Sequence, residues 1–375
     1  MNPAAPRPRP RRWPLVAAIL VLVLGGLWGG LWYAAAGVAD RTIAGWKARE
    51  AKAGRVYSCA SQTIGGFPFG IEVQCADAGA EVKSNGSPFA VKAKDLLISA
   101  RVWQPTVLTS EIVGPLTVAA PGQPASVSAH WRRAQTEVRG LPASPERVSI
   151  RIEQPGVDRA PAGQSLFKAT RLELNGRMVS GTVHDRPVIE IVLHLVAAMA
   201  PNWHPAAAKP VDADITAVLR GLKDFAPEPW PARLRELQAA GGRIDIAHAR
   251  VRQGDTIAVA KGVLGLSPSG RLDGELQLTV ANLEQFLPAL ELDRMVKQQN
   301  APRELENAFG ALDRIMPGLG NVARQNAGPM IVASINMMGQ PTELEGQRAV
   351  ILPLRFNDGA VSLGPVLIGL TPPLF

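Results

Sequence analysis

Few residues in this chain have the types and the spacing that catalysis or metal binding requires. Ser165 and Lys168 match the serine half of a penicillin-binding signature, but its S-D-N and K-T-G partners do not occur. Asp212 and Asp214 lie on one face of an alternating segment, where two carboxylates could hold a metal or face solvent. We interpret them as part of a solvated polar face. The histidines show no H-E-x-x-H or comparable ligand spacing: His130, His184, His194, His204 and His248.

Other catalytic motifs do not occur in the sequence. There is no G-x-S-x-G, P-loop or dinucleotide fingerprint, so we expect neither an enzyme nor a bound cofactor. The formal net charge is +8, and four arginines among the first twelve residues account for half of it. Because the rest of the chain is nearly neutral, the charge argues against nucleic acid as a partner.

The two cysteines, Cys59 and Cys75, are predicted to form a disulfide. Their midpoint falls in the turn-forming segment 65–70, so a hairpin folded there sets the two residues opposite each other. In an oxidising compartment the bridge would close a loop of about 15 residues, worth roughly 3 kcal/mol. The alternative is a redox-active pair, which more typically reads C-x-x-C.

The N-terminal region predicts a membrane anchor. Residues 1–12 alternate proline and arginine and form a disordered basic arm, and no charged residue occurs between Trp13 and Ala39. We expect a transmembrane helix over 13–36, with aromatic residues at its far end and the basic arm in the cytoplasm. The alternative is a cleaved signal peptide, because small residues occupy 34–36 and 37–39. In both cases the bulk of the chain is exported.

The rest of the chain is predicted to be mainly β, a β-rich α+β fold in which a large, curved antiparallel sheet carries a few short helices. Apolar and polar residues alternate over 148–153, 171–174, 211–217 and 272–280, which is typical of half-buried strands. Glycine-containing turns are expected at Asn175-Gly176, 253–255, 267–270 and 357–359. Helices are expected over 231–240, 282–290 and 303–315.

This pattern divides the chain into successive parts. A first β-rich part with the Cys-bridged hairpin covers 37–200, a Pro-rich connection covers 201–231, and a second β-rich part with helices covers 232–375. One face of such a sheet needs a cover, which helices or a lipid could provide.

The chain resembles a family of uncharacterised, membrane-anchored proteins of Gram-negative, mainly alphaproteobacterial, cells. The resemblance rests on an ordered set of residues: Trp46, Gly54, Tyr57, Cys59, Gly66-Phe67-Pro68-Phe69, Cys75, the segment 101–105 and the segment 358–365. It implies an inner-membrane, single-pass protein whose bulk lies in the periplasm, and it implies no activity. Residues 262–287 also resemble, more loosely, segments of AsmA-like envelope proteins, which are thought to hold lipids in long β-grooves.

We therefore expect a periplasmic protein that binds a lipid or another envelope amphiphile in a β-groove. The alternative is a non-enzymatic scaffold or assembly partner that binds other envelope proteins through a sheet edge or an exposed patch. The alternation predicts the following residues as the groove lining, although the same residues could make an ordinary sealed core: Leu272, Leu276, Leu278, Val280, Val350, Leu352, Leu354 and Phe356.

The uncleaved anchor is testable on purified protein. Edman degradation should read the sequence of the basic arm, because the charge-free run exceeds a normal signal peptide h-region. A mature chain that begins at Ala35, Gly37 or Asp40 would instead establish cleavage.

Overall fold

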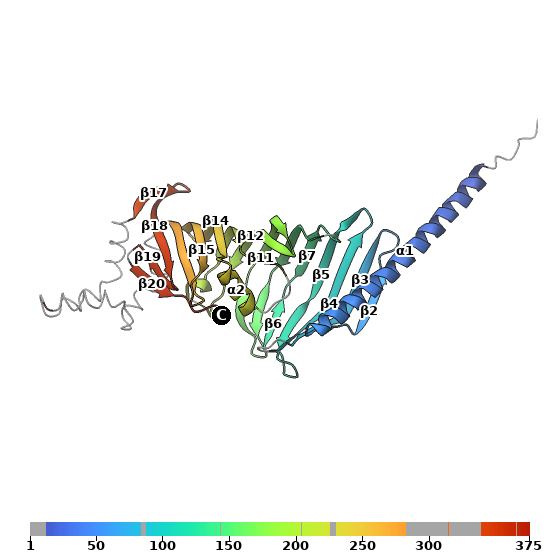
Figure 1. Ribbon diagram of the computed structural model, residues 1–375, viewed down its shortest axis with the longest axis horizontal. Helices are drawn as coiled ribbons and strands as arrows, with labels where there is room; N and C mark the ends of the chain where they lie inside the picture. Colours follow the sequence, from blue (N-terminus) through green and yellow to red (C-terminus); the bar gives the residue numbers. More distant parts are fainter. Residues whose placement is uncertain are drawn as a thin grey trace, which may run out of the picture.

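In the computed structural model, one antiparallel sheet of twenty strands forms most of the described chain (Figure 1). The structure describes residues 13–83, 88–142, 144–203, 205–225, 230–282, 314, 339–364 and 366–375. The mainly β fold with an N-terminal apolar helix and a large antiparallel sheet is confirmed.

The strands follow each other along the chain with short connections. In chain order they are β1 (Arg55–Ser58), β2 (Ser61–Gly65), β3 (Gly70–Val82), β4 (Phe89–Arg101), β5 (Gln104–Ala119), β6 (Val127–His130), β7 (Arg133–Arg139), β8 (Arg147–Glu153), β9 (Gly156–Arg159), β10 (Gln164–Lys168), β11 (Arg171–Thr182), β12 (Asp185–Ala198), β13 (Val211–Arg220), β14 (Arg243–Gln253), β15 (Thr256–Leu266), β16 (Leu272–Ala281), β17 (Gln340–Leu344), β18 (Gln347–Asn357), β19 (Ala360–Leu363) and β20 (Val366–Leu370).

The topology is an up-and-down meander. Most strands pair with the strand that precedes or follows them, and β6–β7, β8–β9 and β10–β11 behave as three long strands that are each interrupted once. At one end of the sheet β1 and β2 share the edge beside β3, and at the other end β17 and β19 both pair with β18. Because β12 pairs directly with β13, one sheet continues across the Pro-rich connection.

A line of backbone irregularities crosses the sheet from β3 to β12. Asp77, Gln154 and Ala197 have positive φ angles of 48°, 50° and 51°, and the β4–β5 register shifts between Ala93 and Asp95. The interruptions of β6–β7, β8–β9 and β10–β11 fall at the same level. Irregularities of this kind bend a strand and increase its twist, so their alignment curves the sheet along its length.

The helix α1 (Trp13–Lys52) is continuous over 40 residues. The predicted span over 13–36 is therefore the first part of a longer helix that continues to Lys52. At 1.5 Å per residue, α1 is about 60 Å long, twice the thickness of a bilayer core. It is long and apolar enough to cross a membrane, and it leaves the sheet at the end where β2, β3 and β4 lie (Figure 1). None of its side chains is buried within the protein.

The second half of α1 packs along the β1–β2 edge. The Trp46 and Tyr57 rings lie 4.6 Å apart, and the Lys47 ammonium donates to Gln62 Oε1 at 2.8 Å. The Gln62 amide in turn donates to Asp40 Oδ1 at 3.0 Å. These contacts hold the helix against the sheet along several turns.

The predicted disulfide is present beside this contact. Cys59 and Cys75 are bonded, with Cα atoms 5.4 Å apart. The predicted register is wrong by three residues, because Cys75 pairs with Gln62 and Cys59 lies in the gap between β1 and β2. The turn is longer on its C-terminal side than the cysteine spacing suggested, since Gly65 pairs with Glu72.

Other sequence predictions have mixed outcomes. The helix predicted at 231–240 is α2 (Trp230–Ala239), and the 3-10 helix η1 (Pro205–Ala208) precedes β13. The turn predicted at Asn175-Gly176 is wrong, because both residues lie inside β11 and pair with β8 and β12. The helices predicted at 282–290 and 303–315 fall outside the described residues, apart from Asn282 and Arg314.

Loss of the disulfide should destabilise the chain. Replacing Cys59 and Cys75 together by alanine removes a cross-link over a sequence separation of 16, and we expect the free energy of unfolding to fall by roughly 3 kcal/mol. Urea unfolding of the full-length protein in detergent, followed by the fluorescence of its tryptophans, measures the change. Thiol labelling of denatured, unreduced wild-type protein is the companion assay, and two labelled thiols would contradict the bridge.

Candidate functional site

The candidate site is one face of the sheet, which the strand register makes largely apolar, with Ser110 and Thr136 as its polar members. Residues that pair across neighbouring strands form rows, and three adjacent rows cross the same twelve strands from β3 to β18. The first row is Cys75, Leu96, Ile112, Ala134, Ile152, Leu172, Leu195, Ala213, Val251, Ala258, Val280 and Val350.

The other two rows run parallel to the first on the same face. The second row is Val73, Ile98, Ser110, Thr136, Ile150, Leu174, Leu193, Ile215, Ala249, Ala260, Leu278 and Leu352. The third row is Ile71, Ala100, Leu108, Val138, Val148, Gly176, Ile191, Ala217, Ile246, Gly262, Leu276 and Leu354. No charged side chain interrupts these rows, and we call them together the apolar face.

Burial changes along the apolar face. Between β3 and β14 its members are half-buried or exposed, apart from the small residues Cys75, Ala134 and Ala213. In the described part of the chain, the two helices make their main contacts with β1, β2 and β15. The middle of the apolar face therefore lies away from those helix contacts.

The eight residues predicted to line a groove lie at the far end of this face. All are on the paired strands β16 and β18, and six of them belong to the three rows. Leu276, Leu278, Val280 and Leu352 are buried, whereas the other predicted lining residues are half-buried. Ala281, on the opposite face, is as completely buried as Val280, so the sheet is covered on both sides here. Sequence reasoning identified half-buried strands at 148–153, 171–174 and 211–217 in the more exposed stretch over β3–β13, but it did not assign their residues to the lining.

The opposite face of the sheet is polar. One row of paired residues on this opposite face lies between the first and second apolar rows. It consists of Gln74, Leu97, Glu111, Gln135, Arg151, Glu173, His194, Asp214 and Arg250. Neighbouring charges in it form ion pairs, such as Arg151 with Glu173 at 3.3 Å. Such exposed pairs contribute little individually, about 0.2–1 kcal/mol.

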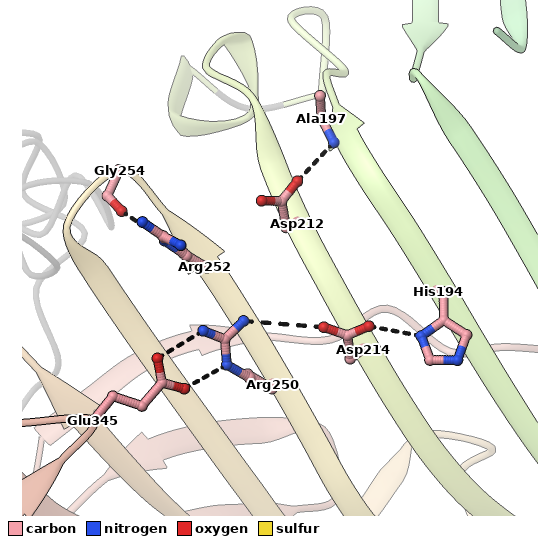
Figure 2. Close-up of polar contacts among 8 residues, drawn as sticks. All are labelled: His194, Ala197, Asp212, Asp214, Arg250, Arg252, Gly254 and Glu345. Atoms are coloured by element: carbon pink, nitrogen blue, oxygen red, sulfur yellow. Dashed lines mark hydrogen bonds and ion pairs between the residues drawn. The ribbon is translucent and has the colours of Figure 1, made fainter.

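One network on the polar face joins distant parts of the chain (Figure 2). His194 Nδ1 lies 2.7 Å from Asp214 Oδ1, and Asp214 Oδ2 lies 4.0 Å from Arg250 Nη1. Arg250 also binds Glu345 in a two-pronged pair, with Nε to Oε1 at 2.6 Å and Nη2 to Oε2 at 2.8 Å. Because Glu345 lies in the β17–β18 turn, the network ties that hairpin to β14. This pairing gave no signal in the sequence, where the two residues are 95 positions apart.

The two carboxylates singled out in the sequence both have partners on the polar face. Asp212 Oδ1 accepts a hydrogen bond of 2.8 Å from the backbone N–H of Ala197, at the positive-φ position where the β12–β13 register shifts. Asp214 pairs with His194, as above. Asp212 thus provides an acceptor for a backbone N–H that the β12–β13 hydrogen-bond ladder does not pair at this point.

This polar network is suited to holding strands together. A His–Asp pair can activate a nucleophile when a hydroxyl or thiol lies beside the imidazole, but the row neighbours of His194 are Glu173 and Asp214. Among the described residues, no group of three or more His, Cys, Asp or Glu side chains could hold a metal ion. The apolar face is therefore the stronger candidate for a binding function.

The fold and the two faces of the sheet together define a single-sheet β protein. It carries a long apolar helix at one end and an apolar face that no charged side chain interrupts. The chain belongs to a family of uncharacterised proteins conserved in bacteria (DUF2125), whose model matches residues 32–372. No curated protein and no solved structure matches the chain. The looser resemblance of 262–287 to AsmA-like proteins is not shown by these comparisons.

The Arg250–Glu345 pair predicts a pH-dependent hairpin. The hydrogen bond from Arg250 lowers the pKa of Glu345 below its usual value of 4.5, so the pair stabilises the fold above that value and is lost as the pH falls through the lowered pKa. Glu345→Gln should raise the hydrogen exchange of the β17 amides at pH 7. Wild-type protein should show the same rise, corrected for intrinsic exchange, only in acid. Glu343→Gln on the same hairpin is the control, and equal exchange in both variants would contradict the role of Glu345.

Proposed function

We propose that this protein is anchored in the inner membrane by α1, and that it binds a lipid or a similar envelope amphiphile along the apolar face, with no catalytic step. The observation that carries the proposal is the set of three apolar rows across twelve strands, most of which lies away from the main helix contacts.

The dimensions of the apolar face suit an extended ligand. At about 4.8 Å between strands and about 3.4 Å per residue, twelve strands and three rows span roughly 50 Å by 14 Å. Exposed apolar patches of several hundred Å² on soluble surfaces usually mark interaction sites. Each methylene of an acyl chain buried there would contribute about 0.8 kcal/mol, so binding needs no specific polar contact.

The orientation of the protein follows from charge and from the disulfide. Four arginines precede the apolar helix, and positive charge favours the cytoplasmic side of a span. The bridge between Cys59 and Cys75 supports an oxidising compartment for the sheet. Both observations support a periplasmic location for the residues that follow the span.

Adjacent residues on β12 provide a matched test, because successive side chains of a strand point to opposite faces. Leu193 lies in the second apolar row and Val192 lies on the polar face, paired with Asn175 and Thr216. Leu193→Glu should lower the uptake of a fluorescent phospholipid by the full-length protein about tenfold or more, since a charge on the apolar face costs at least 1.4 kcal/mol of binding. Val192→Glu should leave uptake within twofold of wild type.

A cross-linking assay separates lipid on the sheet from lipid around α1. A photoreactive residue at position 193 should cross-link to phospholipid in cells, and one at position 192 should not. Equal uptake by both Glu variants, together with no lipid adduct at 193, would overturn the proposal. A protein adduct at 193 in its place would favour the scaffold alternative.

A further inference from the structure

Two neighbouring turns beside α1 expose an unusual amount of aromatic surface. The β2–β3 turn carries Phe67 and Phe69, and the β4–β5 turn carries Trp103; these side chains are 57%, 63% and 60% exposed. The Phe69 and Trp103 rings lie 6.0 Å apart, and the N–H of Val102 donates to the Phe69 carbonyl at 3.0 Å. The two turns therefore form one structural unit, which we call the aromatic tip.

The aromatic tip is held against α1 at a defined level. Trp28 Nε1 donates to the Pro68 carbonyl at 3.0 Å, and Trp32 Nε1 donates to the Gly70 carbonyl at 2.7 Å. The Trp32 ring also meets the Phe67 ring at 5.6 Å. The tip thus lies beside the helix turns that contain Trp28 and Trp32.

This level coincides with the far side of a bilayer. The helical rise places Trp32 about 29 Å from Trp13 along the axis, and the hydrocarbon core is about 30 Å thick. Trp13 follows the basic arm directly, so the span begins there, and the first charged residue after it is Asp40. Tryptophan and other aromatic residues favour the membrane–water interface, where their rings contact both lipid and water.

We propose that the aromatic tip inserts into the interface of the bilayer that α1 spans, on the side away from the basic arm. The inference rests on the membrane anchoring proposed above. Arg101 supports it, because its guanidinium lies 5.8 Å from the centre of the Trp103 ring and could bind a lipid phosphate at this depth.

Insertion of the tip would place one end of the apolar face at the lipid surface. Ile71 and Ala100, which begin the third apolar row, are two residues from Phe69 and from Val102 respectively. The remaining strands extend away from this end (Figure 1). The tip therefore brings the interface of the bilayer next to the start of the apolar face on the β3–β4 pair.

The test places a fluorophore on the tip of the full-length protein. Trp103→Cys can be labelled alone with a nitrobenzoxadiazole dye in the absence of reductant, because Cys59 and Cys75 are bonded to each other. The matched control is Trp203→Cys. Trp203 is 91% exposed and follows the end of β12, farther from the aromatic tip than positions 103 and 69. Phe69→Cys provides a second tip position.

Each labelled protein is reconstituted in phosphatidylethanolamine–phosphatidylglycerol vesicles that contain a doxyl-labelled phospholipid. Quenching at positions 103 and 69 should be at least threefold stronger than at position 203. Equal quenching at all three positions, in protein that floats with the vesicles, would overturn the inference and leave the anchor intact. Failure to float would instead overturn the anchoring on which the inference rests.

Discussion

The structure depends on one constraint: a sheet that is apolar on one face over twelve strands cannot leave that face in water. A fully exposed apolar face of about 700 Å² would correspond to roughly 17 kcal/mol of hydrophobic free energy, more than the whole free energy of unfolding of a typical domain. Between β3 and β14 most of the apolar side chains remain half-buried, so the strands themselves do not complete the cover.

The position of α1 determines which apolar phase could cover the apolar face. A flexible linker after the span would let the sheet move freely. Here the helix continues for about three further turns beyond Asp40 and is fixed by contacts such as Trp46 with Tyr57. The disulfide fastens the same corner, since Cys59 lies between β1 and β2 and Cys75 lies on β3. The end of the sheet that carries the aromatic tip therefore keeps a constant relation to the helix. Under the proposed anchoring, the lipid bilayer would be the nearest apolar phase.

The alternation of apolar and polar residues predicted the strands well, but it predicted poorly how the strands pair with one another. The period-two pattern correctly identified β8, β13 and β16, because each strand must present one apolar face on its own. It misplaced Asn175-Gly176, since glycine favours turns locally but here lies inside β11, paired with Val148 and Ile191. The hairpin register and the Arg250–Glu345 pair depend on irregularities and curvature, which no local pattern encodes.

The residues predicted to line a groove show the same limit of reasoning from local sequence patterns. Leu278 and Leu352 were predicted to line a groove, with a sealed core as the alternative, and these two side chains are buried. Along the apolar face, burial is thus most complete on β16 and β18, at the end opposite α1. Under the proposed lipid binding, a lipid that entered from the bilayer would first meet half-buried side chains such as Ile71 and Ile98, and would reach the enclosed strands last. That order favours a ligand drawn from the membrane over one captured at the distal end of the sheet.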